Sequence, residues 1–159
     1  MHEVIISIGS NIDPEENLKK SLLLLARKLT ILDYSHIWKS KSFGSSGPDF
    51  LNMAVKVKTK LDRKSIKEKI LRKIEIDLGR KKLPDKNAPR TIDLDIVVFN
   101  GKVIDDDVWS KVFVTIPVSE IEPTLQNPFS AKDIRLIAQE MKNLDQAELY
   151  SVSEDFFSF

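Results

Sequence analysis

The chain has 159 residues, which suits one domain with a sizeable core, and its 42% hydrophobic and 31% charged residues are typical of a globular protein rather than a disordered or membrane-embedded one. The formal net charge of +1 gives no bulk attraction to nucleic acid or anionic lipid, and the absence of cysteine excludes disulfides and thiolate metal sites. Because no basic region precedes the first apolar run, a cytoplasmic location without a membrane or nucleic-acid partner is expected.

The first part of the chain shows a strand–helix–strand pattern. A β-branched run predicts a strand over residues 3–8. Helix-start signals follow, with Asp13 as the N-cap, Pro14 at the first helical position and Glu16 completing a capping box. Leucines at helical spacing extend this helix to residue 29, and a second strand is expected over residues 30–41.

A strand–helix–strand pattern then recurs after a loop of residues 42–48 that is rich in Gly, Ser and Pro. Valines and lysines alternate up to Thr59, which predicts a strand with one solvated face. Isoleucines at helical spacing predict an amphipathic helix over residues 61–79 that stops at Gly79. A fourth strand is predicted over residues 91–99 and ends at an Asn-Gly hairpin turn.

The order β-α-β-β-α-β over residues 3–99 is that of the α+β ferredoxin-like sandwich. We predict one domain over residues 1–159, with an antiparallel sheet, both helices on one face, and the other face open or partly covered. Residues 112–125 are expected to end in a short helical turn, and residues 130–144 to form a helix in a C-terminal extension. The phenylalanines of the tail are expected to dock onto the domain.

Two aspartates interrupt the most apolar strand-like run, "TIDLDIVVF", although strands disfavour aspartate. Because alternate residues of a strand share a face, Asp93 and Asp95 point the same way, roughly 6–7 Å apart at Cα. They are either solubilising acids on an edge or surface strand, or oxygen ligands for one or two hard cations such as Mg²⁺. The apolar residues of the other face, which are expected to contact the helices, are Ile92, Leu94, Ile96 and Val98.

The loop before this strand is basic. Residues 79–90 contain one acid, Asp85, and five cations, which are Arg80, Lys81, Lys82, Lys86 and Arg90. Cations beside two carboxylates suit a polyphosphate that arrives with Mg²⁺, and a solvated connection is the alternative. The chain has no P-loop motif and no evident strong general base, so its chemistry is expected to rest on positioning and charge stabilisation.

The stretch "KNAPRTIDLDIVVF" resembles the signature of the 6-hydroxymethyl-7,8-dihydropterin pyrophosphokinase family of folate synthesis. The matching positions are Ala88, Pro89, Arg90, Asp93 and Asp95. Four further blocks resemble the family in the same order, and five ordered blocks are more specific than any single motif. These four are "IISIGSN" (5–11), "GPDFLNMAV" (47–55), "IEIDLGRKK" (74–82) and "PVSEIEPTL" (117–125).

This resemblance implies the ferredoxin-like fold and transfer of the β,γ-pyrophosphoryl group of ATP to the hydroxymethyl oxygen of the pterin, with release of AMP. It implies that Asp93 and Asp95 bind two Mg²⁺ ions that bridge the triphosphate of the co-substrate ATP. The implied catalytic or ATP-binding side chains are, besides these aspartates, Glu75, Arg80, Lys82, Arg90 and Lys111. The implied pterin-binding residues are Ser40, Lys41, Phe43, Phe50, Asn52 and Phe113.

The sequence also departs from the family. The Pro-His pair that follows the carboxylate strand is missing, Lys111 stands where the family has arginine, and Asn87 stands where it has an aromatic residue. Two other interpretations therefore stay open. One is a relative that binds a pterin or nucleotide without efficient transfer, and the other is an RNA-binding module that uses the basic loop, against which the low net charge argues. A monomer or weak dimer is expected.

Overall fold

The computed structural model describes residues 1–40, 48–80, 91–144 and 146–158. Its elements in chain order are β1 (His2–Ser10), α1 (Pro14–Lys28), β2 (Thr30–Tyr34), β3 (Ile37–Ser40), β4 (Phe50–Thr59), α2 (Arg63–Ser65), a π-helical segment (Ile66–Leu71), α3 (Arg72–Asp77), β5 (Asp93–Phe99), β6 (Lys102–Val103), α4 (Asp107–Ser110), α5 (Val112–Ile121), α6 (Ile134–Asn143), β7 (Glu148–Tyr150) and a 3-10 helix (Glu154–Phe157). None of the helices in this described part of the chain combines the length and apolar character that crossing a bilayer requires.

The strands form one antiparallel sheet in the order β6-β5-β1-β4-β3-β7, and β2 also pairs with β4. The two long strands β1 and β4 pair along their whole length and form the centre of the sheet. With β2 and β3 counted together as one broken strand, this is the strand order of the ferredoxin-like sandwich. The α+β fold predicted from the sequence is confirmed.

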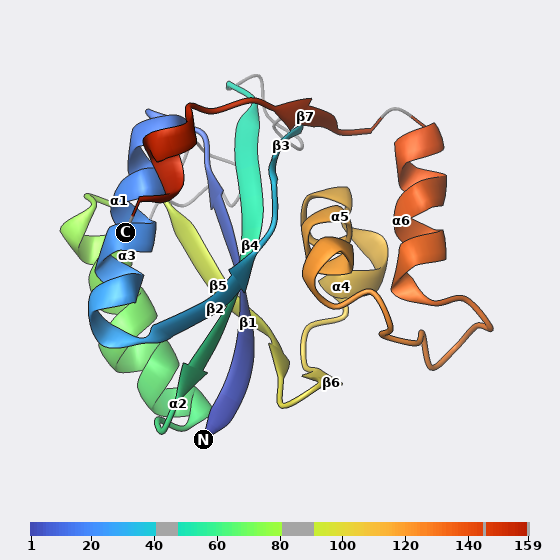
Figure 1. Ribbon diagram of the computed structural model, residues 1–159, viewed down its shortest axis with the longest axis horizontal. Helices are drawn as coiled ribbons and strands as arrows, with labels where there is room; N and C mark the ends of the chain where they lie inside the picture. Colours follow the sequence, from blue (N-terminus) through green and yellow to red (C-terminus); the bar gives the residue numbers. More distant parts are fainter. Residues whose placement is uncertain (41–47, 81–90, 145, 159) are drawn as a thin grey trace.

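The helices form two layers on the sheet (Figure 1). On one face, α1 and the helix that runs from α2 to α3 bury an apolar cluster that includes Ile6, Leu22 and Met53. On the other face, α4 and α5 bury a second cluster, which includes Ile5 and Val118, and α6 packs outside α5. Both predicted helices therefore cover one face, and the opposite face is partly covered, as expected.

The second of the predicted helices contains a π-helical segment. Ile66, Ile70 and Ile74 form its buried stripe, as predicted, and the wider turn also buries Leu71 fully against the sheet. The stop at Gly79 is confirmed, since this glycine has a φ of 85°, a conformation that L-residues with a side chain rarely adopt.

A β-bulge breaks the alternation of side chains along β5. Ile6 of β1 pairs with Ile96, whereas the preceding Ile5 pairs with Val98, so Val97 is an extra residue on β5. A bulge of this kind shifts every later side chain of the strand to the other face.

The bulge corrects one prediction and preserves another. Val98 packs in the cluster under α5, and Phe99 packs on the cluster under α1, so the prediction that Val98 contacts the first two helices is wrong. Asp93 and Asp95 precede the bulge and share a face as predicted. The strand begins at Asp93, two residues later than the sequence suggested.

The predicted second strand is in fact two strands. Both pair with β4, but the register slips by one residue between them, because Tyr34 lies opposite Val55 and Trp38 lies opposite Asn52. Ser35 occupies the slip, and its hydroxyl accepts a hydrogen bond of 2.9 Å from a backbone N–H of β4. As a result, β2 and β3 do not form one continuous ladder with β4, and β3 is a separate short strand.

The start of α1 differs from the predicted capping box. Asp13 adopts a left-handed conformation with a φ of 40°, and its side chain makes no capping hydrogen bond. Its carbonyl instead accepts from the Asn17 N–H at 2.9 Å, and the Asn17 side chain donates to the Ile12 carbonyl at 2.7 Å. The prediction of Pro14 at the first helical position is confirmed.

The segment after β6 forms a longer helix than predicted. Residues 112–121 form α5, a helix of ten residues with Pro117 inside it, rather than a short helical turn. Seven of the ten residues of α5 are apolar and seven are buried, because the helix lies between the sheet and α6.

The C-terminal tail docks onto the domain as expected (Figure 1, red). β7 extends the sheet beside β3, and the following 3-10 helix places Phe156, which is 3% exposed, in the cluster under α1. Phe157 stacks on Tyr34 with ring centroids 4.3 Å apart. Phe159 lies outside the described residues.

Candidate active site

One row of directly opposed residues crosses the sheet. It connects residues predicted to bind the pterin with residues predicted to bind the metal. Trp38 of β3 lies opposite Asn52 of β4, Asn52 lies opposite Gly9 of β1, and Gly9 lies opposite Asp93 of β5. Directly opposed residues of an antiparallel sheet share a face, so all four lie on the face that α5 partly covers. Gly9 therefore separates an amide on one side from a carboxylate on the other.

The amide half of the site is held by hydrogen bonds. The Asn52 side chain is buried, and its Nδ2 donates to Ser40 Oγ at 2.7 Å and to the Trp38 carbonyl at 3.5 Å. A Cβ atom on Gly9 would lie 2.9 Å from Asn52 Oδ1 and 3.8 Å from the Phe50 ring. The structure thus brings together three of the predicted pterin residues around a glycine that leaves room for them.

The carboxylate half is organised by Arg80. Its Nη1 contacts Glu75 Oε2 and also lies 2.8 Å from Asp93 Oδ1. Glu75 Oε2 accepts a further hydrogen bond of 3.0 Å from the Leu94 N–H, which ties the end of α3 to β5. This is possible because Gly79 turns the chain back after α3, so that the Arg80 N–H reaches the Glu75 carbonyl at 2.9 Å.

Negative charge accumulates around Asp95. The Asp95 side chain reaches solvent, but partial desolvation by the surrounding protein, together with the carboxylates of Asp93, Glu75 and Asp105, raises its pKa to about 7. Burial also raises the pKa of Glu75, although the Leu94 N–H and Arg80 act in the opposite direction. Burial lowers the pKa of Arg80, but Asp93 and Glu75 raise it by more, so the guanidinium stays charged.

Asp105 is a residue of this site that the sequence analysis missed. It follows β6, its Oδ1 accepts a hydrogen bond of 3.0 Å from the Asp107 N–H, and it adds to the negative field at Asp95. The run of three aspartates at residues 105–107 was the available signal, but nothing in the sequence showed that this run returns to β5.

The donor set fits a magnesium ion. Asp93 and Asp95 offer carboxylate oxygens on one face, and the raised pKa of Asp95 reflects desolvation and then the neighbouring negative charges, which a divalent cation would offset. Within the described ranges, no group of three or more His, Cys, Asp or Glu side chains is arranged to hold a metal on its own. Mg²⁺ usually takes one or two carboxylates and completes its shell with waters and substrate phosphates, so the pair Asp93 and Asp95 is a sufficient protein donor set.

The remaining predicted residues lie on or next to α5 or fall outside the described residues. Phe113, at the second position of α5, packs on the apolar cluster that contains Val97, on the sheet face that carries the site. Lys111 precedes α5, and its N–H donates to the Asp107 carbonyl at 3.0 Å. The predictions that fall outside the described residues concern Lys41, Phe43, Lys82 and Arg90.

Comparison with known proteins agrees with this geometry. The model of the family described as 7,8-dihydro-6-hydroxymethylpterin-pyrophosphokinase matches residues 5–123. Proteins named 2-amino-4-hydroxy-6-hydroxymethyldihydropteridine pyrophosphokinase are similar to the chain. The one from Bacillus subtilis is 34% identical over 128 residues, which cover 73% of this chain and 75% of the relative. The one from Synechocystis is 29% identical over 150 residues, which cover 87% and 76%.

Longer proteins match the chain over part of their length. A folic acid synthesis protein of Dictyostelium discoideum is 32% identical over 135 residues, and the match covers 79% of this chain but 20% of that protein. The crystal structure of wild-type HPPK-DHPS from Plasmodium falciparum superposes with a TM-score of 0.73 at 11% identity, and the match covers 97% of this chain and 49% of the solved chain. At that identity the likeness shows the fold alone. By the family model and the sequence relatives, the chain belongs to the 7,8-dihydro-6-hydroxymethylpterin-pyrophosphokinase family.

Proposed function

We propose that this chain transfers the β,γ-pyrophosphoryl group of ATP to the hydroxymethyl oxygen of 6-hydroxymethyl-7,8-dihydropterin, a step of folate synthesis. The observation that carries this proposal is the row through Gly9, which places a fixed amide, Asn52, and a carboxylate pair, Asp93 and Asp95, on one face of the sheet. An amide suits the hydrogen-bonding edge of a pterin, and the carboxylates suit a magnesium–triphosphate. The two substrates would therefore meet above Gly9.

The transfer balances without a further reactant. The hydroxymethyl oxygen attacks the β-phosphorus, the bond between that phosphorus and the oxygen that joins it to the α-phosphate breaks, and AMP leaves with the electron pair. The hydroxyl proton passes to solvent. Bound at Asp93 and Asp95, Mg²⁺, for which we propose two ions, would neutralise charge that develops at the transferred phosphates.

The protein's own groups bind and orient the substrates in this proposal. Arg80 lies beside Asp93 and is placed to contact a phosphate oxygen, and Glu75 holds the Arg80 side chain from α3. The further phosphate-binding cations are proposed to be Lys82, Arg90 and Lys111. On the pterin side, Asn52 Oδ1 accepts a hydrogen bond from the ring edge while its Nδ2 stays bound to Ser40 Oγ and the Trp38 carbonyl, and Phe50 and Phe113 flank the ring. The remaining lining is proposed to come from Ser40, Lys41 and Phe43.

The proposal extends to the setting of the enzyme. Residues 1–159 form a single pyrophosphokinase domain that acts in the cytoplasm as a monomer or weak dimer, without nucleic acid as a partner. Support for the absence of nucleic acid comes from the net charge of +1.

The test is direct detection of AMP. Purified protein is incubated with ATP, Mg²⁺ and the hydroxymethyl-dihydropterin, and AMP release is followed by chromatography. AMP that appears only when the pterin is present supports the enzyme. Tight pterin binding without AMP would replace the proposal with a binding protein, and salt-sensitive RNA binding with neither would favour an RNA-binding module.

Gly9→Ala should weaken pterin binding more than ATP binding. The new methyl group would lie 2.9 Å from Asn52 Oδ1, so the Asn52 amide must move away from the position in which Ser40 holds it. We expect the KM for the pterin to rise roughly tenfold, the size of one displaced hydrogen bond, while the KM for ATP changes little. Steady-state kinetics with each substrate varied in turn measures both. Equal rises in the KM for the pterin and the KM for ATP would contradict the proposal that the pterin binds beside Asn52 and ATP beside the carboxylates.

A further inference from the structure

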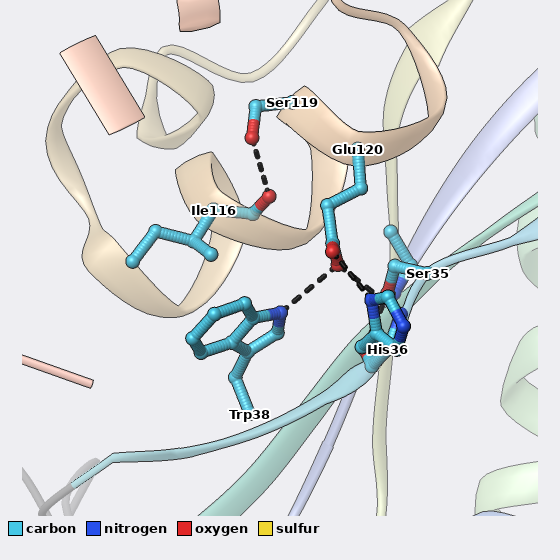
Figure 2. Close-up of polar contacts among 7 residues, drawn as sticks. Ser35, His36, Trp38, Ile116, Ser119 and Glu120 are labelled. Atoms are coloured by element: carbon cyan, nitrogen blue, oxygen red, sulfur yellow. Dashed lines mark hydrogen bonds and ion pairs between the residues drawn. The ribbon is translucent and has the colours of Figure 1, made fainter. Parts of the chain in front are cut away.

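Glu120 joins α5 to β3 through three hydrogen bonds (Figure 2). Its Oε1 accepts from the His36 N–H at 3.1 Å and from Trp38 Nε1 at 2.9 Å, and its Oε2 lies 2.6 Å from His36 Nδ1. A carboxylate only accepts hydrogen bonds, so His36 Nδ1 carries a proton in this contact. The Glu120 side chain is 21% exposed, and a partly buried acceptor of this kind contributes more than a surface ion pair.

The partners of Glu120 lead directly to the amide half of the site. Trp38 packs against Ile116 of α5 and lies opposite Asn52, and its carbonyl accepts from Asn52 Nδ2 at 3.5 Å. Two residues later on the same short strand, Ser40 Oγ accepts from the same Nδ2 at 2.7 Å. One residue, Trp38, therefore separates the Glu120 carboxylate from the Asn52 amide.

Glu120 gives the short strand β3 a side-chain anchor in addition to its backbone pairing. The ladder with β4 consists of the pairs that start at Trp38 and end at Ser40, β7 pairs with the other edge, and the register slip at Ser35 interrupts the continuity with β2. The same helix that carries Glu120 near its C-terminus carries Phe113 near its N-terminus. The place of α5 on β3 thus sets the spacing between Phe113 and the residues of the amide half.

We infer that Glu120 is a positioning residue of the amide half of the site, where we propose that the pterin binds. Glu120 acts on Asn52 through Trp38. This inference rests on the proposed function. Removal of the carboxylate leaves the N–H groups of His36 and Trp38 without their acceptor. The backbone ladders of β3 remain, but the Trp38 carbonyl and the Ser40 hydroxyl, which hold Asn52, then lose their support from α5. The carboxylate half, on β5 and α3 at the other side of Gly9, is not held by Glu120 and stays in place.

Glu122 provides a matched control. It lies directly after α5 and pairs with Lys56 of β4, so it too anchors the end of this helix to the sheet. Lys56 lies opposite Ile5, four residues along β1 from the row that contains Gly9. Loss of the Glu122 carboxylate therefore tests general loosening of α5 without touching the residues that hold Asn52.

The experiment compares Glu120→Ala, Glu120→Gln and Glu122→Ala in the AMP assay, with each substrate varied in turn. We expect Glu120→Ala to raise the KM for the pterin about tenfold while kcat and the KM for ATP change less than about twofold, since one buried hydrogen-bonding group is lost on the pterin side only. Glu120→Gln keeps an acceptor for Trp38 and should restore most of the pterin affinity. Glu122→Ala should lower the melting temperature without a comparable rise in the pterin KM.

Three results would overturn the inference: an unchanged pterin KM in Glu120→Ala, an equal rise in Glu122→Ala, or an equal rise for ATP. A spectroscopic readout in a Trp109→Phe background adds a second test, because loss of its partner should change the emission of Trp38. If the wild-type chain makes no AMP, the proposed function fails by itself. The role of Glu120 is then tested by equilibrium binding of the pterin in the presence of Mg²⁺ and α,β-methylene-ATP. The dissociation constants of the pterin and of the ATP analogue replace the two KM values, and the same three results would overturn the inference.

Discussion

Replacement of Asp95 by asparagine should remove transfer activity and leave the metal-free fold at least as stable as the wild type. In the metal-free protein the Asp95 carboxylate is partly desolvated and lies among Asp93, Glu75 and Asp105, and this desolvation and repulsion oppose folding. With Mg²⁺ and ATP present, the same carboxylate is a proposed ligand. We expect kcat/KM for AMP production to fall roughly 10³-fold or more, since several kcal/mol of charge stabilisation are lost. Asp93→Asn should behave similarly in the assay.

Two controls separate metal ligation from general electrostatics. Asp105→Asn removes a carboxylate from the same patch but from outside β5, and we expect it to lower the rate far less than Asp95→Asn. Addition of Mg²⁺ with an ATP analogue should raise the melting temperature of the wild type but not that of Asp95→Asn. A large drop in the melting temperature of metal-free Asp95→Asn would instead point to a structural role for this carboxylate.

The same repulsion predicts a pH dependence of stability. The folded-state pKa of Asp95, about 7, lies above its ordinary value of 3.8, so the folded metal-free protein binds a proton more tightly than the unfolded chain does. This contribution is complete below pH 3.8 and is lost as the pH rises through 7. Urea midpoints measured in EDTA between pH 5 and 8 should therefore fall more steeply for the wild type than for Asp95→Asn. Because Asp95 is exposed to solvent, screening keeps this difference small.

The shared face of Asp93 and Asp95 was predictable because period-two alternation is reliable where polar and apolar residues alternate. Beyond Ile96 the strand reads Val-Val-Phe, and no polar residue marks a face there. The bulge at Val97, which moves Val98 to the other face, could therefore not be recognised from the alternation of polar and apolar residues. The pairing of β5 with β1 determines it, and this pairing is a tertiary property.

The helix α5 was predicted too short for a different reason, because its local sequence argues against a helix. Its sequence, VFVTIPVSEI, is rich in β-branched residues and contains Pro117, both of which disfavour helix in isolation. Burial against the sheet on one side and α6 on the other outweighs these local preferences, and a helix with apolar residues on both of its buried sides carries no clear 3.6-residue periodicity. The same helix bears Glu120, whose contact with Trp38 spans 82 positions of sequence, so this link was invisible until the fold placed the two side by side.

Within the site, residue types were predictable and partnerships were not. The basic loop and the two aspartates indicated a place for polyphosphate, and the family resemblance identified Glu75 and Arg80. That Arg80 bridges Glu75 and Asp93 depends on the left-handed turn at Gly79, which brings the chain back over the end of α3. Gly79 was predicted as a helix stop, but a stop alone does not say where the next side chain goes.

Arg80→Ala should lower the rate of transfer much more than it weakens pterin binding. In the ligand-free protein Arg80 compensates the charges of Glu75 and Asp93. Asp93 would hold the metal of a bound magnesium–triphosphate, and Arg80, still held by Glu75, would then be available to bind a phosphate oxygen. We expect kcat to fall roughly 10²-fold or more, as for other preorganised donors to developing charge, with the pterin KM changed by no more than about threefold. Single-turnover AMP formation and pterin binding with α,β-methylene-ATP measure the two effects separately.

Glu75→Gln separates the catalytic and structural roles of Arg80. This variant keeps an acceptor for the Leu94 N–H but loses the charge that holds the guanidinium, so Arg80 remains present and is less well placed. If Arg80 acts on the phosphates, Glu75→Gln should lower kcat by less than Arg80→Ala does, and Arg80→Lys should recover part of the rate, because an ammonium supplies the charge without the two-pronged geometry. If Arg80 only anchors α3 to β5, Glu75→Gln and Arg80→Ala should lower the melting temperature equally and leave kcat close to that of the wild type. The second outcome would remove Arg80 from the catalytic group and leave Asp93 and Asp95 to act with cations from other segments.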